Sequence, residues 1–346
     1  MKIKWGVIGG GGIADRRTMP GMLLAGNAEL AGIMEVNGDL AGKLGEKYGV
    51  KAYDSIESLF AGCECDAVYI ASPVVYHKEQ ILAAADAGKH ILVEKPVALT
   101  AGEAQEAADY CEKKGVLLAA GFMMRFAAYH QQMKKWVAEG KLGKVVNASG
   151  QFTCWYPEIK GAWRQKKSLS GGGALMDMGV HVIDLLQYVT GSRIRRVGAF
   201  CDTKTFSYEV DDSASLLVQF ESGANGCIHA NFNIPDEAAK WRVEFYGTKG
   251  RIIGDETIGQ AEAGEVDALF TGGGAGYDAA QNKKTARQAE AEVELGNMYT
   301  KEIESFGESL LKGLPLECPA ADAVFVQRVA EAAYLSAETG KFISLL

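Results

Sequence analysis

The sequence predicts an α/β protein in two parts: a parallel sheet wound by helices on both faces, then an α+β domain. The first observation is a repeated alternation of short apolar strands and helical patterns up to about residue 126. The second is a series of longer β patterns beyond residue 143, joined by short turns. The 346 residues suffice for two domains, placed at 1–124 and 125–346, with the C-terminal helices free to pack back on the first.

The composition is that of an ordinary globular protein, with 48% hydrophobic and 23% charged residues. A net charge of −8 argues against nucleic acid or an anionic membrane as the main partner. The seven scattered cysteines are odd in number, which argues against a disulfide framework and favours a reducing cytoplasm. They also lack the spacing of a metal site, so we expect no metal. No run of 18 apolar residues and no signal-peptide pattern is present, so we expect neither secretion nor membrane spanning.

The first strand pattern, Ile3 to Ile8, leads into a glycine-rich turn that reads Gly-x-Gly-x-x-Ala. In such a motif, Gly9 permits a tight turn, Gly11 permits close approach of a pyrophosphate, and Ala14 permits close packing of strand and helix. The helix expected over about 13–25 then offers backbone N–H groups to the phosphates. The context of strand, turn and helix therefore indicates a Rossmann dinucleotide-binding unit.

Glu35 stands at the end of the second predicted strand, Glu29 to Met34. A carboxylate there can accept hydrogen bonds from the adenosine ribose, and it repels a 2′-phosphate. Val36 and Asn37 follow, so no basic residue is at hand to pair with such a phosphate. We therefore favour NAD over NADP, the alternative being an ordinary surface glutamate.

The alternation continues through the rest of the first part. It predicts strands at 67–71, 91–93 and 116–120, and helices at about 40–48, 77–87 and 100–114, the last with a Thr100–Glu103 capping box. Ligands of such sheets bind beyond the carboxyl ends of the strands. Those ends carry Gly9, Glu35, Ser72, Pro73, Glu94, Lys95 and Gly121.

Lys95 at one of these ends can orient substrate hydroxyls and lower the pKa of a neighbouring base. Pro96 restrains the backbone beside it, and we expect a cis bond there. The alternative is an exposed lysine in a turn.

The second part begins with a helix expected over Tyr129–Glu139. Strands are expected at 145–154, 194–201, 214–220, 224–232 and 241–246, and closing helices at 299–311 and 320–336. The short turns predict an antiparallel meander whose free face could meet another chain. The Gly-, Ala- and Glu-rich region 254–296 is expected to be a loop with partial order.

Three glycines, Gly171 to Gly173, lead into a helical pattern that carries Asp177, His181 and Asp184. Offsets of 0, 4 and 7 put these side chains on one helix face. A histidine between two carboxylates can accept a proton while held in a chosen tautomer. The alternative is a buried polar cluster that ties the helix to its neighbours.

Together, these motifs resemble the Gfo/Idh/MocA family of NAD(P)-dependent oxidoreductases. The matching positions are Gly9-x-Gly11-x-x-Ala14, Glu35, Glu94-Lys95-Pro96, Gly171-Gly172-Gly173-x-Leu175-x-Asp177-x-Gly179-x-His181-x-x-Asp184, and Ala333-Tyr334-x-Ser336-Ala337-x-Thr339-Gly340-Lys341. The resemblance implies an N-terminal Rossmann fold and a C-terminal domain with an open, mostly antiparallel sheet. It also implies a homodimer or homotetramer formed through that sheet.

The resemblance also implies roles for individual residues. Lys95 would bind substrate and lower nearby pKa values, His181 would be the general acid/base, and Asp177 would bind substrate or support His181. Asp184 would orient His181 or be structural. The residues expected at the cofactor are Gly9, Gly11, Gly12, Ile13, Ala14, Glu35, Ser72, Pro73, His77, Glu94, Lys95, Trp163 and Arg164. Those expected at the substrate are Lys95, Arg125, Tyr156, Asp177 and His181.

The implied reaction is reversible hydride transfer between a secondary alcohol and a nicotinamide. The expected substrate is a sugar, a glycoside (with a 3-keto-glycoside as one product) or a cyclitol. Aromatic residues at Cys154-Trp155-Tyr156-Pro157 and Trp163 suit a sugar ring, or else belong to the core. An inositol or aldose dehydrogenase and a keto-sugar reductase remain open. A non-catalytic dinucleotide-binding regulator is the alternative of another class, but the presence of Lys95, Asp177 and His181 favours an enzyme.

Overall fold

A computed structural model describes residues 1–239, 241–272, 277, 279–280 and 286–345. Its contacts group the chain into two compact units. The first unit comprises Met1–Phe126, Lys160–Gly172 and Asn297–Arg328, and the second comprises Ala127–Ile159, Gly173–Gly296 and Val329–Leu346. Segments far apart in the sequence therefore belong to one unit. The division into domains at residue 124 stays a prediction.

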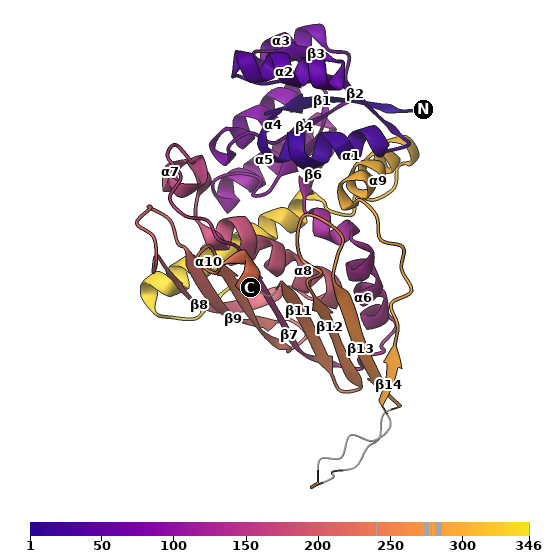
Figure 1. Cartoon of the computed structure of the whole chain (residues 1–346), viewed down its shortest axis with the longest axis vertical. Helices are drawn as coiled ribbons and strands as arrows, with labels where there is room; N and C mark the ends of the chain where they lie inside the picture. Colours follow the sequence, from indigo (N-terminus) through magenta and orange to yellow (C-terminus); the bar gives the residue numbers. More distant parts are fainter. Residues whose placement is uncertain (240, 273–276, 278, 281–285, 346) are drawn as a thin grey trace. The chain divides into compact units, whose positions relative to one another are not determined.

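The first unit contains a six-stranded parallel sheet in the order β3-β2-β1-β4-β5-β6 (Figure 1). Its strands are β1 (Ile3–Ile8), β2 (Ala28–Met34), β3 (Lys51–Tyr53), β4 (Ala67–Ile70), β5 (His90–Glu94) and β6 (Leu118–Gly121). The strand order reverses beside β1, which is the arrangement of a Rossmann fold. This confirms the fold class predicted for the first part of the chain.

Helices and short helical turns accompany the strands of this unit. They are η1 (Ala14–Thr18), α1 (Met19–Leu24), α2 (Gly38–Tyr48), α3 (Ile56–Gly62), η2 (Val74–Tyr76), α4 (His77–Asp86), α5 (Ala101–Lys114), η3 (Met123–Phe126), η4 (Trp163–Gln165), α7 (Lys167–Ser170) and α9 (Met298–Lys312). The predicted capping residue Thr100 accepts a hydrogen bond from the Glu103 N–H at 3.1 Å. The helix expected over 13–25 starts with a π-helical turn, η1, before it becomes α1.

Helix α9 packs beside α1 although nearly 280 residues separate them (Figure 1). The Thr300 hydroxyl donates to the Gly21 carbonyl at 3.0 Å. Beneath them, the Trp5 and Phe306 rings lie 5.1 Å apart in a core that includes both helices and the sheet. This apolar contact covers one face of the parallel sheet, as burial of its Val- and Ile-rich strands requires.

The second unit contains a nine-stranded sheet in the order β14-β13-β12-β11-β7-β10-β9-β8-β15 (Figure 1). Its strands are β7 (Val145–Thr153), β8 (Ile194–Asp202), β9 (Ser213–Phe220), β10 (Asn225–Asn231), β11 (Arg242–Gly247), β12 (Gly250–Asp255), β13 (Glu265–Thr271), β14 (Ala286–Ala289) and β15 (Ile343–Ser344). Strands β7 and β10 pair in parallel and the other neighbours antiparallel, which confirms a mostly antiparallel sheet.

The prediction of a loop over 254–296 is wrong where β13 and β14 form, because these strands extend the sheet beyond β12. These two segments form strands because neighbouring strands offer them hydrogen-bonding partners. The local composition of a segment does not show whether such partners are present. Residues 273–276, 278 and 281–285 of this region lie outside the described residues.

Helices cover one face of the second sheet. They are α6 (Ala128–Ala138), α8 (Val180–Thr190) with the preceding π-helical turn η5 (Leu175–Gly179), and the second half of α10 (Ala320–Thr339). The short η6 (Asp236–Ala238) follows β10. Helix α8 approaches β7 so closely that a Cβ on Gly150 would lie 2.5 Å from Val182. The sequence segment singled out for its chemistry is thus packed directly on the sheet.

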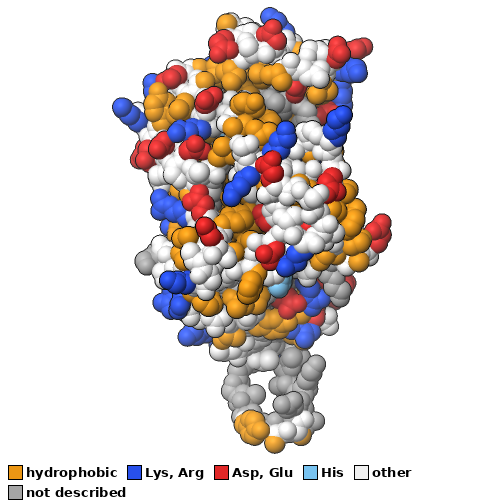
Figure 2. Space-filling view, turned by 90° about the vertical axis from the view of Figure 1, so that its left-hand side faces the viewer, with side chains coloured by type: hydrophobic (Ala, Val, Ile, Leu, Met, Phe, Trp, Pro, Cys, Tyr) orange, Lys and Arg blue, Asp and Glu red, His pale blue; other side chains and the backbone are white. Residues whose placement is uncertain are grey.

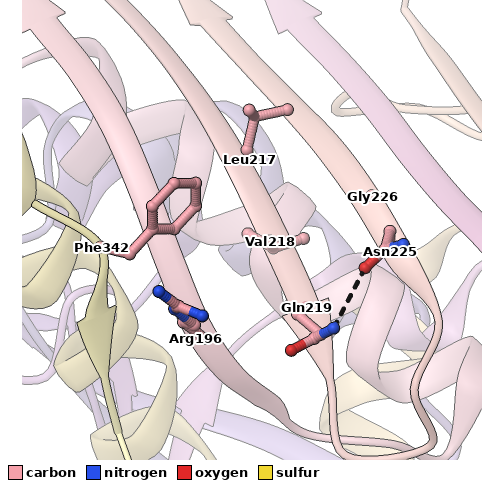
Figure 3. Close-up of a pocket in the computed structure, with 7 residues that line it drawn as sticks. All are labelled: Arg196, Leu217, Val218, Gln219, Asn225, Gly226 and Phe342. Carbon is pink, nitrogen blue, oxygen red and sulfur yellow. Dashed lines mark hydrogen bonds between the residues drawn. The ribbon is translucent and has the colours of Figure 1, made fainter.

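The other face of the sheet leaves large apolar side chains exposed, with Phe200, Leu217 and Phe342 at 77%, 56% and 52%. A depression of about 280 Å³ lies there (Figure 3). It is lined by Arg196, Leu217, Val218, Gln219, Asn225, Gly226 and Phe342. Elsewhere, basic and acidic side chains are interspersed over the face seen in Figure 2. Within the described residues, no helix is long and apolar enough to cross a membrane.

Candidate active site

The glycine-rich turn after β1 is shaped by the backbone beyond β4. Gly9 has φ of +81°, and a Cβ there would lie 2.6 Å from the Ser72 nitrogen. Only glycine fits such a close approach. Gly12 also has a positive φ, of +56°, and Ala14 is fully buried at the start of η1. This cradle fits a dinucleotide pyrophosphate, because no side chain stands between the strand end and the helix start.

Glu35 lies beside this turn, as the ribose role requires. Its Oε2 accepts a hydrogen bond from the Gly11 N–H at 3.3 Å, and its Oε1 accepts one from the Asn37 N–H at 3.1 Å. Asn37 in turn caps α2 by accepting from the Leu40 N–H. The carboxylate is therefore held by backbone groups at the end of β2, where a ribose diol would find two acceptor oxygens.

His77 connects two of the strand ends. Its Nδ1 lies 2.9 Å from the Pro96 carbonyl, and its Nε2 lies 2.8 Å from the Ser72 carbonyl. Burial lowers the pKa of His77 to about 4, against the effect of both carbonyls. The ring thus lies between the segment after β4 and the Lys95–Pro96 bond, which is cis, as predicted. In its neutral form it carries one N–H and donates to one of the two carbonyls. The role of His77 in cofactor binding stays a prediction, and the ring is covered by protein.

Glu94 ends a buried hydrogen-bond chain. The Thr18 hydroxyl donates to Tyr69 at 2.9 Å, and the Tyr69 hydroxyl donates to Glu94 Oε1 at 2.5 Å. Burial raises the pKa of Glu94, while the charges of Lys95 and Arg164 oppose this rise. The structure thus brings Glu94, Lys95 and Arg164 together in the first unit. Thr18 and Tyr69 stand in no sequence motif and their contacts span 51 and 25 residues, so the sequence alone does not point to them.

Two further predicted residues have partners inside the first unit. The Arg164 guanidinium lies 4.3 Å from the centre of the Trp163 ring. Arg125 is 5% exposed, and its guanidinium donates to Asp322 at 3.0 Å and to the Glu317 carbonyl at 2.7 Å. These contacts hold Arg125 against the start of α10. Its role at the substrate stays a prediction.

Asp177, His181 and Asp184 lie on one continuous segment of the second unit, although it is not a uniform α-helix. Asp177 belongs to the π-helical turn η5, and the other two belong to α8. A π turn inserts an extra residue into a helix and is frequent at functional sites. His181 is 5% exposed and its ring meets Phe152 edge-on at 6.2 Å, whereas Asp184 is 1% exposed. The greater burial of Asp184 suits a structural or orienting role.

Residues after β7 reach the same region of the second unit. Burial raises the pKa of the Cys154 thiol to about 12, and the Asp177 carboxylate adds to this rise. The Tyr156 ring packs on Phe232 at 5.0 Å, while Trp155 is 45% exposed. The aromatic segment is therefore part core and part surface, and its Cys154 lies near the predicted acid/base pair.

No cluster of three or more His, Cys, Asp or Glu placed to hold a metal occurs among the described residues.

Two regions of the chain match known family descriptions. Residues 3–122 match the oxidoreductase family with an NAD-binding Rossmann fold, and residues 130–253 match the GFO/IDH/MocA C-terminal domain. The chain belongs to the Gfo/Idh/MocA family. It is accordingly an oxidoreductase with an NAD(P)-binding domain.

Similar proteins of this family act on sugars. The chain is 29% identical over 342 residues to D-xylose 1-dehydrogenase (NADP(+)) 2 of Haloferax volcanii, covering 99% of each protein. It is 27% identical to D-glucoside 3-dehydrogenase of Escherichia coli, covering 98% of this chain and 96% of that protein. Levoglucosan dehydrogenase, solved with NADH and levoglucosan, superposes over 100% of both chains with a TM-score of 0.87 and 25% identity.

Replacing Gly9 by alanine tests the cradle. We expect Gly9→Ala to weaken NAD binding by about tenfold or more, because the new Cβ would meet the Ser72 backbone. Gly38→Ala, where a Cβ would meet nothing within 4 Å, is the control and should keep the affinity within about twofold. Isothermal titration with NAD measures both, and equal affinities for the two variants would contradict the assignment.

The buried His77 should make the enzyme sensitive to acid. Its folded-state pKa of about 4 lies below the ordinary 6.5, so the unfolded chain takes up the proton first as pH falls. The contribution of His77 to the free energy of unfolding is complete above pH 6.5 and should fall by about 2.5 kcal/mol by pH 4.5. Urea unfolding at pH 7.5 and 4.5 measures this fall. Between these two pH values, His77→Gln should lose less free energy of unfolding than wild type. The exposed His229→Gln is the control and should behave as wild type.

Proposed function

We propose that this enzyme oxidises a secondary hydroxyl of a sugar, glycoside or cyclitol with NAD, or runs the reverse reduction. The observation that carries the proposal is the presence of Lys95, Asp177 and His181 in a chain whose Gly9 turn suits a dinucleotide. The similarity to D-glucoside 3-dehydrogenase and levoglucosan dehydrogenase supports a sugar or glycoside as substrate. Oxidation of a glycoside at its 3-hydroxyl, giving a 3-keto-glycoside, is one form of this reaction.

Each residue of the proposed set has a distinct task. A bound nicotinamide supplies the hydride acceptor or donor. The Lys95 ammonium donates a hydrogen bond to the reacting oxygen and stabilises negative charge there. The His181 imidazole removes the hydroxyl proton during oxidation and returns it during reduction. The Asp177 carboxylate accepts from a second substrate hydroxyl or stabilises the charged His181 ring.

The proposed cofactor is NAD rather than NADP. The Glu35 carboxylate stands beside the turn with both oxygens facing backbone N–H groups, so a 2′-phosphate there would meet a like charge. The relative from Haloferax volcanii carries NADP(+) in its name, so family membership alone does not determine the choice.

Two other functions use the same scaffold. An inositol or aldose dehydrogenase would differ in the substrate ring that is bound, and a keto-sugar reductase would differ in the direction of hydride transfer. A non-catalytic dinucleotide-binding regulator would need no acid/base pair, and the retained Lys95, Asp177 and His181 argue against it.

We further propose that the enzyme is a cytoplasmic homodimer or homotetramer. Phe200, Leu217 and Phe342 on the open face of the second sheet favour association through that face. All seven cysteines are free thiols, in keeping with a reducing compartment. A monomer in sedimentation equilibrium would contradict the proposed oligomer. Recovery of the protein in a secreted fraction would contradict the proposed cytoplasmic location.

The central test is a screen of aldoses, glycosides and cyclitols with NAD, followed by the absorbance of reduced nicotinamide. For the best substrate, we expect His181→Gln to lower kcat by about 10²- to 10⁴-fold, because the proton acceptor is lost. NAD affinity should stay unchanged, since the cradle lies in the first unit. Full turnover by this variant would rule out the acid/base role, and the absence of any substrate would favour the regulator.

Replacing Glu35 by serine tests the choice of cofactor. We expect Glu35→Ser to shift the ratio of NADP to NAD affinity by about tenfold or more towards NADP, because it removes the like charge. Asp39→Ser removes an exposed carboxylate from the first turn of α2 and serves as the matched control. Tighter binding of NADP than of NAD by the unmodified enzyme would contradict the proposal.

A further inference from the structure

A buried carboxylate that no sequence motif singled out holds the start of the segment carrying Asp177 and His181. Asp211 Oδ1 accepts a hydrogen bond from the Gly173 N–H at 2.7 Å, and Oδ2 accepts one from the Leu175 N–H at 2.9 Å. The Asp211 backbone carbonyl accepts from the Ala174 N–H at 2.8 Å. Three consecutive N–H groups at the helix start are thus bound by one residue.

This clamp depends on a very close approach of two backbones. A Cβ on Gly173 would lie 1.9 Å from the Asp211 carbonyl oxygen, so no other residue fits at that position. The last of the three glycines is therefore the place where the segment meets Asp211. The first N–H groups of a helix lack partners within the helix, and a carboxylate there satisfies them and complements the helix dipole.

Asp211 itself accepts a hydrogen bond from α10, which is distant in the sequence. The Tyr334 hydroxyl on α10 donates to Asp211 Oδ1 at 2.7 Å across 123 residues of sequence. Burial raises the pKa of Asp211, and the hydrogen bonds from Tyr334, Leu175 and Gly173 oppose this rise. Two residues on, the Ser336 hydroxyl accepts from the Ala199 N–H at 3.0 Å and donates to the Lys341 carbonyl at 2.6 Å. Tyr334, Ser336 and Lys341 belong to the C-terminal pattern named above. Their contacts give these residues a structural role, whereas the proposed reaction gives them none.

We propose that Asp211, held by Tyr334, is a positioning residue that sets the rotation of the helical segment bearing Asp177 and His181. This inference rests on the proposed function, because it concerns the geometry of that acid/base pair. Side-chain tips lie about 5–6 Å from a helix axis, so a rotation of about 15–20° moves them by more than 1 Å. Displacements of that size cost on the order of 10²-fold in rate when a proton must be transferred.

The neighbouring Asp212 offers a matched control. It is fully buried and also accepts backbone N–H groups, from Lys204, Thr205 and Phe206 at 2.9, 2.7 and 3.0 Å. Its backbone donors belong to the loop before β9, and its side-chain donor Asn233, at 3.1 Å, follows β10. None of these partners belongs to the segment with His181. Asp211→Asn and Asp212→Asn therefore make the same substitution at adjacent buried positions. Only Asp211→Asn is expected to affect the segment with His181.

The experiment compares Asp211→Asn, Tyr334→Phe and Asp212→Asn in the full chain. In Asp211→Asn the amide NH₂ faces a backbone donor, so we expect kcat to fall by about tenfold or more. NAD affinity should stay within about twofold. Tyr334→Phe should change kcat in the same direction by less. The pH profile of kcat should shift in both, whereas Asp212→Asn should keep the wild-type profile.

A readout independent of turnover is the imidazole signal of His181 in ¹H–¹³C NMR, identified by its loss in His181→Gln. We expect its chemical shift and titration to change in Asp211→Asn and Tyr334→Phe and to stay as in wild type in Asp212→Asn. Equal changes in all three variants, or none in the first two, would overturn the inference. If Asp211→Asn does not fold, Tyr334→Phe alone decides. A changed His181 signal in an enzyme that oxidises no sugar would reject the proposed function and leave the positioning role intact.

Discussion

In each unit, the candidate residues depend on backbone segments that approach each other more closely than any side chain allows. In the first unit, the turn at Gly9 lies against the Ser72 backbone. In the second, Gly173 lies against the Asp211 carbonyl. Each contact fixes the start of a helical segment relative to a strand end, so the N–H groups and side chains that follow have a defined place. Adding one methyl group at either position would force the two segments apart.

Both helical segments also begin with a π turn, η1 after the Gly9 turn and η5 after Gly173. A π turn is wider than an α turn and less favourable, so it persists only where surrounding packing imposes it. In the second unit, the packing includes Gly179, whose Cβ would lie 2.7 Å from Leu175.

Carboxylates in the two units do different work according to their surroundings. Glu35 is held by backbone N–H groups at the edge of the cradle. Glu94 lies among Tyr69, Lys95 and Arg164, and its ionisation reflects a balance between burial and two cations. Asp211 accepts hydrogen bonds from the backbone N–H groups of Gly173 and Leu175 and from the Tyr334 hydroxyl. The segment after β7 presents the Trp155 side chain to the surface, while the Tyr156 ring packs on Phe232.

The sequence by itself determined the Rossmann half, the cradle, Glu35 and the candidates Lys95, Asp177 and His181. Each of these rests on local patterns, namely strand and helix periodicity and short motifs at strand ends. Only the tertiary structure decided that β13 and β14 join the second sheet, that Tyr69 binds Glu94, and that Asp211 clamps Gly173. These contacts join residues 25 and 38 positions apart or depend on a neighbouring strand edge. A carboxylate such as Asp211 has the same local appearance as a surface residue, and its role appears only when folding brings its donors to it.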